Sequence, residues 1–119
     1  MQIPRPTDAD KQRFRHLVPE DPRIEIKPMF GNLGAFIQGN MFMGLFGSEI
    51  GVKLRPADQD QVRAAGGTSF GPSERPMNGY VSLPGAARSD QLEAWIASAL
   101  AYVSEQPPKA PKGPKRRRT

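Results

Sequence analysis

The sequence predicts an α+β domain in which a mainly antiparallel, five-stranded sheet forms one layer and helices pack on one of its faces. Two observations support this prediction. Between residues 24 and 54, β-prone stretches are separated by turns of only two or three residues, and strands joined so closely must run antiparallel. Apolar side chains then recur with helical period over residues 92–103. The expected element order is α-β-β-β-β-α-β-α.

The first helix is expected over residues 8–18, with Thr7 or Asp8 as its N-cap. Its apolar residues fall at i, i+3 and i+4 and are Phe14, Leu17 and Val18. The first strand follows at residues 24–30, where apolar and polar residues alternate. Pro28 cannot donate a ladder hydrogen bond, so this strand is expected at a sheet edge or with a bulge.

Five glycines lie among apolar residues in the stretch MFGNLGAFIQGNMFMGLFG, residues 29–47. A phosphate-binding loop would need GxxxxGK[ST], or GxGxxG before a helix, and neither spacing occurs. The glycines are therefore interpreted as hinges between strands. Gly39 and Asn40 suit a two-residue hairpin turn, and a second turn is expected at residues 47–49. Alternation resumes in the next strand at Ile50, Val52 and Leu54.

The second half of the chain contains the other expected elements. Pro56 is expected to open a short helix over residues 57–65, followed by a loop over 68–78 and a strand over 79–83. Ser89 or Asp90 is expected to cap the last helix, with Glu93 at capping-box spacing. Its apolar face, anchored by Trp95, comprises Leu92, Trp95, Ile96, Ala99, Leu100 and Val103.

The stretch MFMGLF, residues 41–46, does not alternate, although a sheet covered on one side should show alternation. Both faces of the second and third strands are therefore predicted to be apolar. We expect the second face to be covered by a loop or by another subunit. The candidate interface residues are Phe36, Phe42 and Phe46.

Few residues suggest catalysis. The chain has no cysteine and one histidine, His16, without a nucleophile or an orienting acid beside it in the sequence. The carboxylates are scattered, and no zinc or calcium motif occurs. The sequence therefore predicts a non-catalytic protein without a cofactor or metal. Four methionines could bind a soft metal ion, but apolar packing is the favoured role for them. They are Met29, Met41, Met43 and Met77.

The basic tail, residues 107–119, carries the excess positive charge of the chain. Its six cations exceed the +5 net charge of the whole chain, so residues 1–106 are close to neutral. Four prolines favour an extended, disordered backbone there, and residues 1–7 are expected to form a flexible lead-in. The tail either contacts phosphates or only keeps the chain soluble, and its cations are Lys109, Lys112, Lys115, Arg116, Arg117 and Arg118. No signal-peptide pattern or membrane span is recognised, which predicts a cytoplasmic protein.

Four motifs resemble the N-terminal domain of the TfoX/Sxy family of small bacterial proteins linked to natural competence. They are Met29-Phe30-Gly31, Gly39-Asn40-Met41, Arg75-Pro76-Met77 followed by Gly79-Tyr80-Val81, and Ala94-Trp95-Ile96. The resemblance covers about residues 8–109 and is to a stand-alone short member with a basic tail. It implies a two-layer domain like that of secretion chaperones over residues 8–106, and supplies no catalytic residue. Arg75 is expected to be a partner contact or a loop anchor.

The leading hypothesis is a non-catalytic adaptor or regulatory module that binds a protein partner through the apolar sheet face or edge. The partner could also be a second copy of the chain, giving a homodimer. The alternative hypothesis is sequence-independent binding of DNA or RNA through the basic tail. An uncharacterised enzyme is the third.

Overall fold

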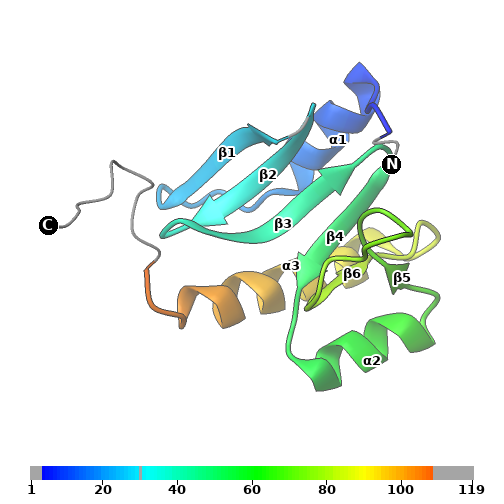
Figure 1. The fold of residues 1–119 in the computed structure, drawn as a ribbon. Helices are drawn as coiled ribbons and strands as arrows, with labels where there is room; N and C mark the ends of the chain where they lie inside the picture. Colours follow the sequence, from blue (N-terminus) through cyan, green and yellow to red (C-terminus); the bar gives the residue numbers. More distant parts are fainter. Residues whose placement is uncertain (1–3, 30, 109–119) are drawn as a thin grey trace, which may run out of the picture.

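The computed structural model describes residues 4–29 and 31–108. Over these residues the fold is α+β as predicted, with three helices and one six-stranded antiparallel sheet of order β1-β2-β3-β4-β6-β5 (Figure 1). The elements in chain order are α1 (Asp8–Leu17), β1 (Ile24–Met29), β2 (Asn32–Ile37), β3 (Asn40–Phe46), β4 (Glu49–Lys53), α2 (Pro56–Ala64), β5 (Thr68–Ser69), β6 (Tyr80–Ser82) and α3 (Ser89–Ser104).

The sixth strand is the main departure from the predicted element order. Residues 68 and 69, read from the sequence as the start of a loop, form β5 and pair with β6. A strand of two residues has no alternation to detect. The expected edge position of the first strand is confirmed, because β1 with Pro28 lies at one end of the sheet. None of the described helices is both long and apolar enough to cross a membrane.

The turn between β2 and β3 lies one residue earlier than predicted. Gln38 and Gly39 have φ angles of 53° and 82°, so they form its two central positions. Asn40 is instead the first residue of β3, opposite Ile37. Its side-chain amide donates a hydrogen bond of 3.0 Å to the carbonyl oxygen of Pro107.

A β-bulge in β3 explains why residues 41–46 do not alternate. Ala35 pairs with Met43 and Phe36 pairs with Met41, which leaves Phe42 as an extra residue. Phe42 and Met43 are consequently both buried in the core, each 0% exposed. The prediction that Phe42 belongs to an interface is therefore wrong.

The core lies between one face of the sheet and the helices α1 and α3. Helix α3 lies across this face against β2, β3 and β4 (Figure 1). The predicted apolar face of α3 is confirmed, and its buried residues are Leu92, Trp95, Ile96, Ala99 and Val103. Phe14 is the buried residue of α1.

The predicted starts of α1 and α2 are confirmed, whereas the predicted cap of α3 is not. Thr7 caps α1 in a capping box with Asp10, and Pro56 occupies the first turn of α2 as expected. The predicted capping box of α3 is wrong: Arg88 is its N-cap residue and makes no side-chain capping bond. The Asp90 carboxylate lies 3.0 Å from the Arg88 guanidinium and accepts from the backbone N–H of Gln91.

Candidate functional site

Three glycines form a row across the sheet face that α3 does not cover, which we call the open face. Gly34 in β2 lies opposite Gly44 in β3, and Gly44 lies opposite Gly51 in β4. Because glycine has no side chain, the row leaves a depression across three strands. Gly34 and Gly44 are thus strand residues and not the hinges that the sequence suggested.

Phe70 fills one end of this depression. A methyl group on Gly51 would lie only 2.3 Å from the Phe70 ring, and one on Gly44 would lie 3.3 Å from it. The ring is 2% exposed, and its centroid lies 6.1 Å from those of Phe46 and Tyr80. Phe70 was not among the predicted site residues, because an apolar residue in a proline-rich loop carries no periodic signal.

The loop that follows Phe70 forms one wall of a groove. The backbone N–H of Met77 donates to the carbonyl oxygen of Phe70 at 2.9 Å, and that of Arg75 donates to Pro72 at 3.0 Å. These bonds fold the loop back on itself, and Phe70 holds it against Gly44 and Gly51 of the sheet. Part of the second sheet face is therefore covered by a loop, one of the two covers that the sequence suggested.

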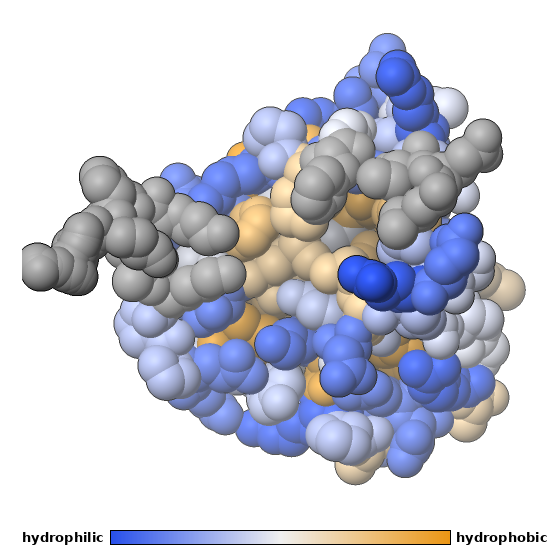
Figure 2. All heavy atoms as spheres, in the orientation of Figure 1, coloured by the Kyte–Doolittle hydropathy of each residue, from blue (hydrophilic) through white to orange (hydrophobic). Residues whose placement is uncertain are grey.

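The groove has a volume of about 420 Å³ and is almost entirely apolar. Figure 2 shows apolar residues gathered near the centre of this face, with hydrophilic residues around them. The groove is lined by Met29, Asn32, Leu33, Met41, Gly44, Leu45, Phe46, Phe70, Pro72, Arg75 and Met77. Five of these were predicted individually, as family-motif or interface residues: Met29, Met41, Phe46, Arg75 and Met77.

The two thioethers on the sheet side of the groove converge over Gly34. A methyl group on Gly34 would lie 3.0 Å from the Met41 sulfur and 3.2 Å from the Met29 sulfur. Met77 lines the groove from the loop, whereas Met43 lies in the core on the other face. Unbranched, polarisable thioethers can repack around differently shaped apolar groups, so these three methionines give the groove an adaptable wall.

Asn32 closes one end of the groove with its side-chain amide. It is 4% exposed, its oxygen accepts from the backbone N–H of Gly47 at 2.8 Å, and its nitrogen donates to the carbonyl oxygen of Pro4 at 3.2 Å. Both ends of the amide are therefore occupied by the protein itself. Arg75 is the other polar side chain of the groove, and it forms no ion pair or side-chain hydrogen bond with another described residue.

Tyr80 joins β6 to the groove. Its hydroxyl donates a hydrogen bond of 2.8 Å to the carbonyl oxygen of Met41, beyond the bulge in β3. Burial raises the pKa of Tyr80 to about 12, because the phenolate would lose its hydration. This tyrosine is consequently a neutral donor that holds the groove wall in place.

The raised pKa of Tyr80 predicts a loss of stability at high pH. The unfolded chain ionises near pH 10, whereas the folded chain holds the proton up to about pH 12. The free energy of unfolding should therefore fall by up to about 3 kcal/mol between these values, before allowance for solvent screening. Urea denaturation of wild type and Tyr80→Phe at pH 9 and pH 11.5 checks this, since the variant should lose less. An equal loss in both proteins would contradict it.

The histidine and the scattered carboxylates of the sequence do not gather at the groove. His16 is exposed on α1, and Asp58 and Asp60 lie on α2. The Asp21 carboxylate accepts a hydrogen bond of 2.7 Å from the Arg23 guanidinium. Its hydrogen bonds with Arg23 lower the pKa of Asp21 to about 2. Within the described ranges, no three His, Cys, Asp or Glu residues are arranged to hold a metal ion.

The remaining motif residues hold turns or the core. Gly31, Gly39 and Gly79 have positive φ angles, which a glycine adopts without strain. Trp95 is buried on α3, and Pro76 is exposed in the loop beside the groove. Phe30 and the six cations of the basic tail lie outside the described residues.

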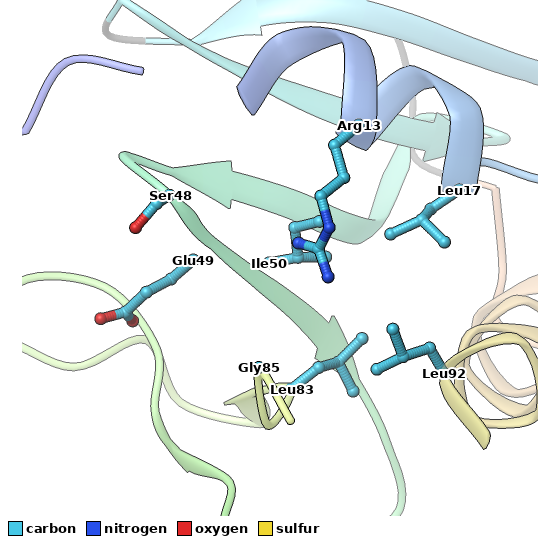
Figure 3. A pocket seen from close by; sticks show the side chains of 8 residues that line it. All are labelled: Arg13, Leu17, Ser48, Glu49, Ile50, Leu83, Gly85 and Leu92. Atoms are coloured by element: carbon cyan, nitrogen blue, oxygen red, sulfur yellow. The ribbon is translucent and has the colours of Figure 1, made fainter. Parts of the chain in front are cut away.

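A smaller cavity of about 190 Å³ lies between α1, β4 and the start of α3. Figure 3 shows Arg13 reaching into it from α1, over Ile50, Leu83 and Leu92, while the Glu49 side chain points away from Arg13. The Glu49 carboxylate accepts a hydrogen bond of 2.9 Å from the Ser82 hydroxyl. One arginine over an apolar floor does not make a specific anion site.

Searches of curated proteins and of solved structures found no match to the chain. A comparison with protein-family models found one, the TfoX N-terminal domain, over residues 13–103. This range includes every strand and α2, together with the second half of α1 and all but the last residue of α3. It also includes all the residues that line the groove. The chain therefore belongs to the TfoX N-terminal domain family.

Proposed function

We propose that this protein is a non-catalytic regulatory adaptor whose groove on the open face binds an apolar segment of a protein partner. The observation that carries the proposal is the groove of about 420 Å³, with its methionine and phenylalanine walls. An apolar groove that opens to solvent on a small domain is typical of an interaction site. The role in natural competence that the family resemblance implies would be exercised through such binding.

The chemistry of the lining favours a protein segment over a polar metabolite. Small-molecule sites usually add several precisely placed polar groups to an apolar lining. Here the amide of Asn32 is already bonded to Gly47 and Pro4, which leaves Arg75 as the free polar group. Recognition must therefore come mainly from apolar contacts, which large side chains of a partner protein supply.

A charge placed in the groove should weaken this binding. A random 16-residue peptide library displayed on phage would be selected on wild type, and the enriched peptides measured by fluorescence anisotropy. We expect them to carry large apolar residues. Met77→Asp, and independently Met29→Asp, should weaken them at least tenfold, since each places a carboxylate among apolar groups. Thermal melts would establish that both variants are folded.

Ile26→Asp is the matched control for this experiment. Ile26 is an exposed apolar residue on β1 that lies opposite Ala35, and so on the helix side of the sheet. This variant should bind the selected peptides like wild type. Equal weakening by Ile26→Asp would place the binding at the sheet edge and contradict the groove. If wild type forms a stable dimer and Met77→Asp dissociates it, the groove is occupied by a second copy of the chain. That result would contradict a separate protein partner.

Sequence-independent nucleic-acid binding through the basic tail is the second candidate. The bond between Asn40 and Pro107 ties the start of the tail to the first residue of β3, next to the β2–β3 turn. If all six tail cations contact phosphates, the logarithm of affinity for a 20-base-pair duplex should fall with log salt at a slope of about −5. A full-length variant with the six cations replaced by glutamine should lose this binding. Retained binding would contradict the candidate.

A further inference from the structure

We propose that the segment bound in the groove is acidic as well as apolar, and that three cations at the groove border, Lys27, Lys53 and Arg75, pair with its carboxylates. This inference rests on the proposed function and names the chemistry of its partner. We call these three residues the cationic rim. They come from β1, β4 and the loop after Phe70, so they approach the groove from different sides.

Aromatic rings hold two of the rim cations beside the groove. The Lys27 ammonium lies 4.8 Å from the centroid of the Phe36 ring, and the Lys53 ammonium lies 5.9 Å from that of Tyr80. Each ring adjoins Met41: the methyl position of Gly34 is within 3.0 Å of both Phe36 and Met41, and the Tyr80 hydroxyl bonds to the Met41 carbonyl. Both ammonium groups are thus placed close to the apolar lining.

The rim cations have little competition from the protein's own carboxylates. Lys27 has one carboxylate nearby, that of Glu25 at 3.8 Å, and the two side chains are 50% and 74% exposed. An exposed pair at that distance contributes little. In the described part of the chain, Lys53 and Arg75 form no ion pair.

The two other acids in this region leave the rim available. Glu74 is an exposed neighbour of Arg75 in the loop and forms no ion pair within the described ranges. Glu49 lies at the opposite end of β4 from Lys53, where Ser82 donates to it. The border of the groove is therefore cationic near Met41, which complements a segment with carboxylates beside its apolar anchors.

The test uses the peptides selected on wild type, which should be enriched in Asp and Glu next to large apolar residues. The triple variant Lys27→Gln, Lys53→Gln, Arg75→Gln should bind them about tenfold more weakly near 50 mM salt, because three exposed pairs are lost. The matched control is Arg13→Gln, Arg15→Gln, Arg63→Gln, which removes three cations from α1 and α2 and should bind like wild type.

A comparison with charge-neutralised peptides isolates the pairing between the cationic rim and the peptide carboxylates. Peptides whose Asp and Glu are replaced by Asn and Gln should bind wild type about tenfold more weakly and should bind the triple variant no worse than the acidic originals do. Selected peptides that lack acids, or an equal loss in the control variant, would overturn this inference while leaving the groove in place. Loss of duplex DNA binding in the triple variant without loss of peptide binding would also overturn it. Peptides insensitive to Met77→Asp would instead refute the proposed function.

Discussion

Replacement of Phe42 with alanine is expected to lower the free energy of unfolding by about 3–5 kcal/mol. Phe42 is fully buried because the bulge in β3 turns it and Met43 to the same side of the sheet. Truncation would leave a cavity beneath α3 that the packed core cannot close. Urea denaturation followed by circular dichroism measures the loss.

Phe36→Ala is the matched control for Phe42→Ala. Phe36 was predicted as an interface residue together with Phe42, but it is only partly buried and lies on the open face. Its truncation should cost about 1–2 kcal/mol, since less apolar area leaves water on folding. A loss from Phe36→Ala equal to or larger than that from Phe42→Ala would show that the bulge is placed incorrectly.

Gly51→Ala is expected to destabilise the protein by about 3 kcal/mol through overpacking. The new methyl group would lie 2.3 Å from the Phe70 ring, which is rigid and almost fully buried, so either the ring or the sheet must move. The measurement is again urea denaturation. Gly85→Ala is the control, because a methyl group at Gly85 meets nothing within 4 Å and should cost little or slightly stabilise the fold.

A double-mutant cycle assigns the effect of Gly51→Ala to Phe70. Phe70→Ala alone should destabilise, because it removes a buried ring from the open face. In the double variant the methyl group occupies space left by the ring. The double variant should therefore be less destabilised than the sum of the two single variants, by about 1–2 kcal/mol. Strictly additive losses would mean that the two residues are not in contact.

The elements with a strong local pattern were predictable from the sequence. The apolar face of α3 repeats from residue 92 to residue 103, and Pro28 marks β1 as an edge strand because it lacks a ladder donor. The capping box of α3 was not realised, because Arg88 attracts the Asp90 carboxylate that capping would have required. Local patterns thus predicted which elements exist more securely than how each one begins.

The groove could be predicted only in part, because it depends on strand register. The bulge inserts one residue into β3, and no residue type marks that position. The glycine row carries a usable signal, since Gly34, Gly44 and Gly51 occur in three consecutive strands and align once the turns are placed. The loop meets the sheet where Phe70 packs over Gly51, and local periodicity cannot show a contact between residues so far apart in the sequence.

The most direct test of the account is methionine-methyl NMR of the full chain during titration with a peptide selected on wild type. Met29, Met41 and Met77 line the groove, whereas Met43 is buried on the opposite face of the same sheet. If the peptide binds in the groove, we expect large shifts of the first three methyl signals and little change at Met43. A shift confined to Met43, or no shift at the three groove methionines while the peptide binds, would contradict it.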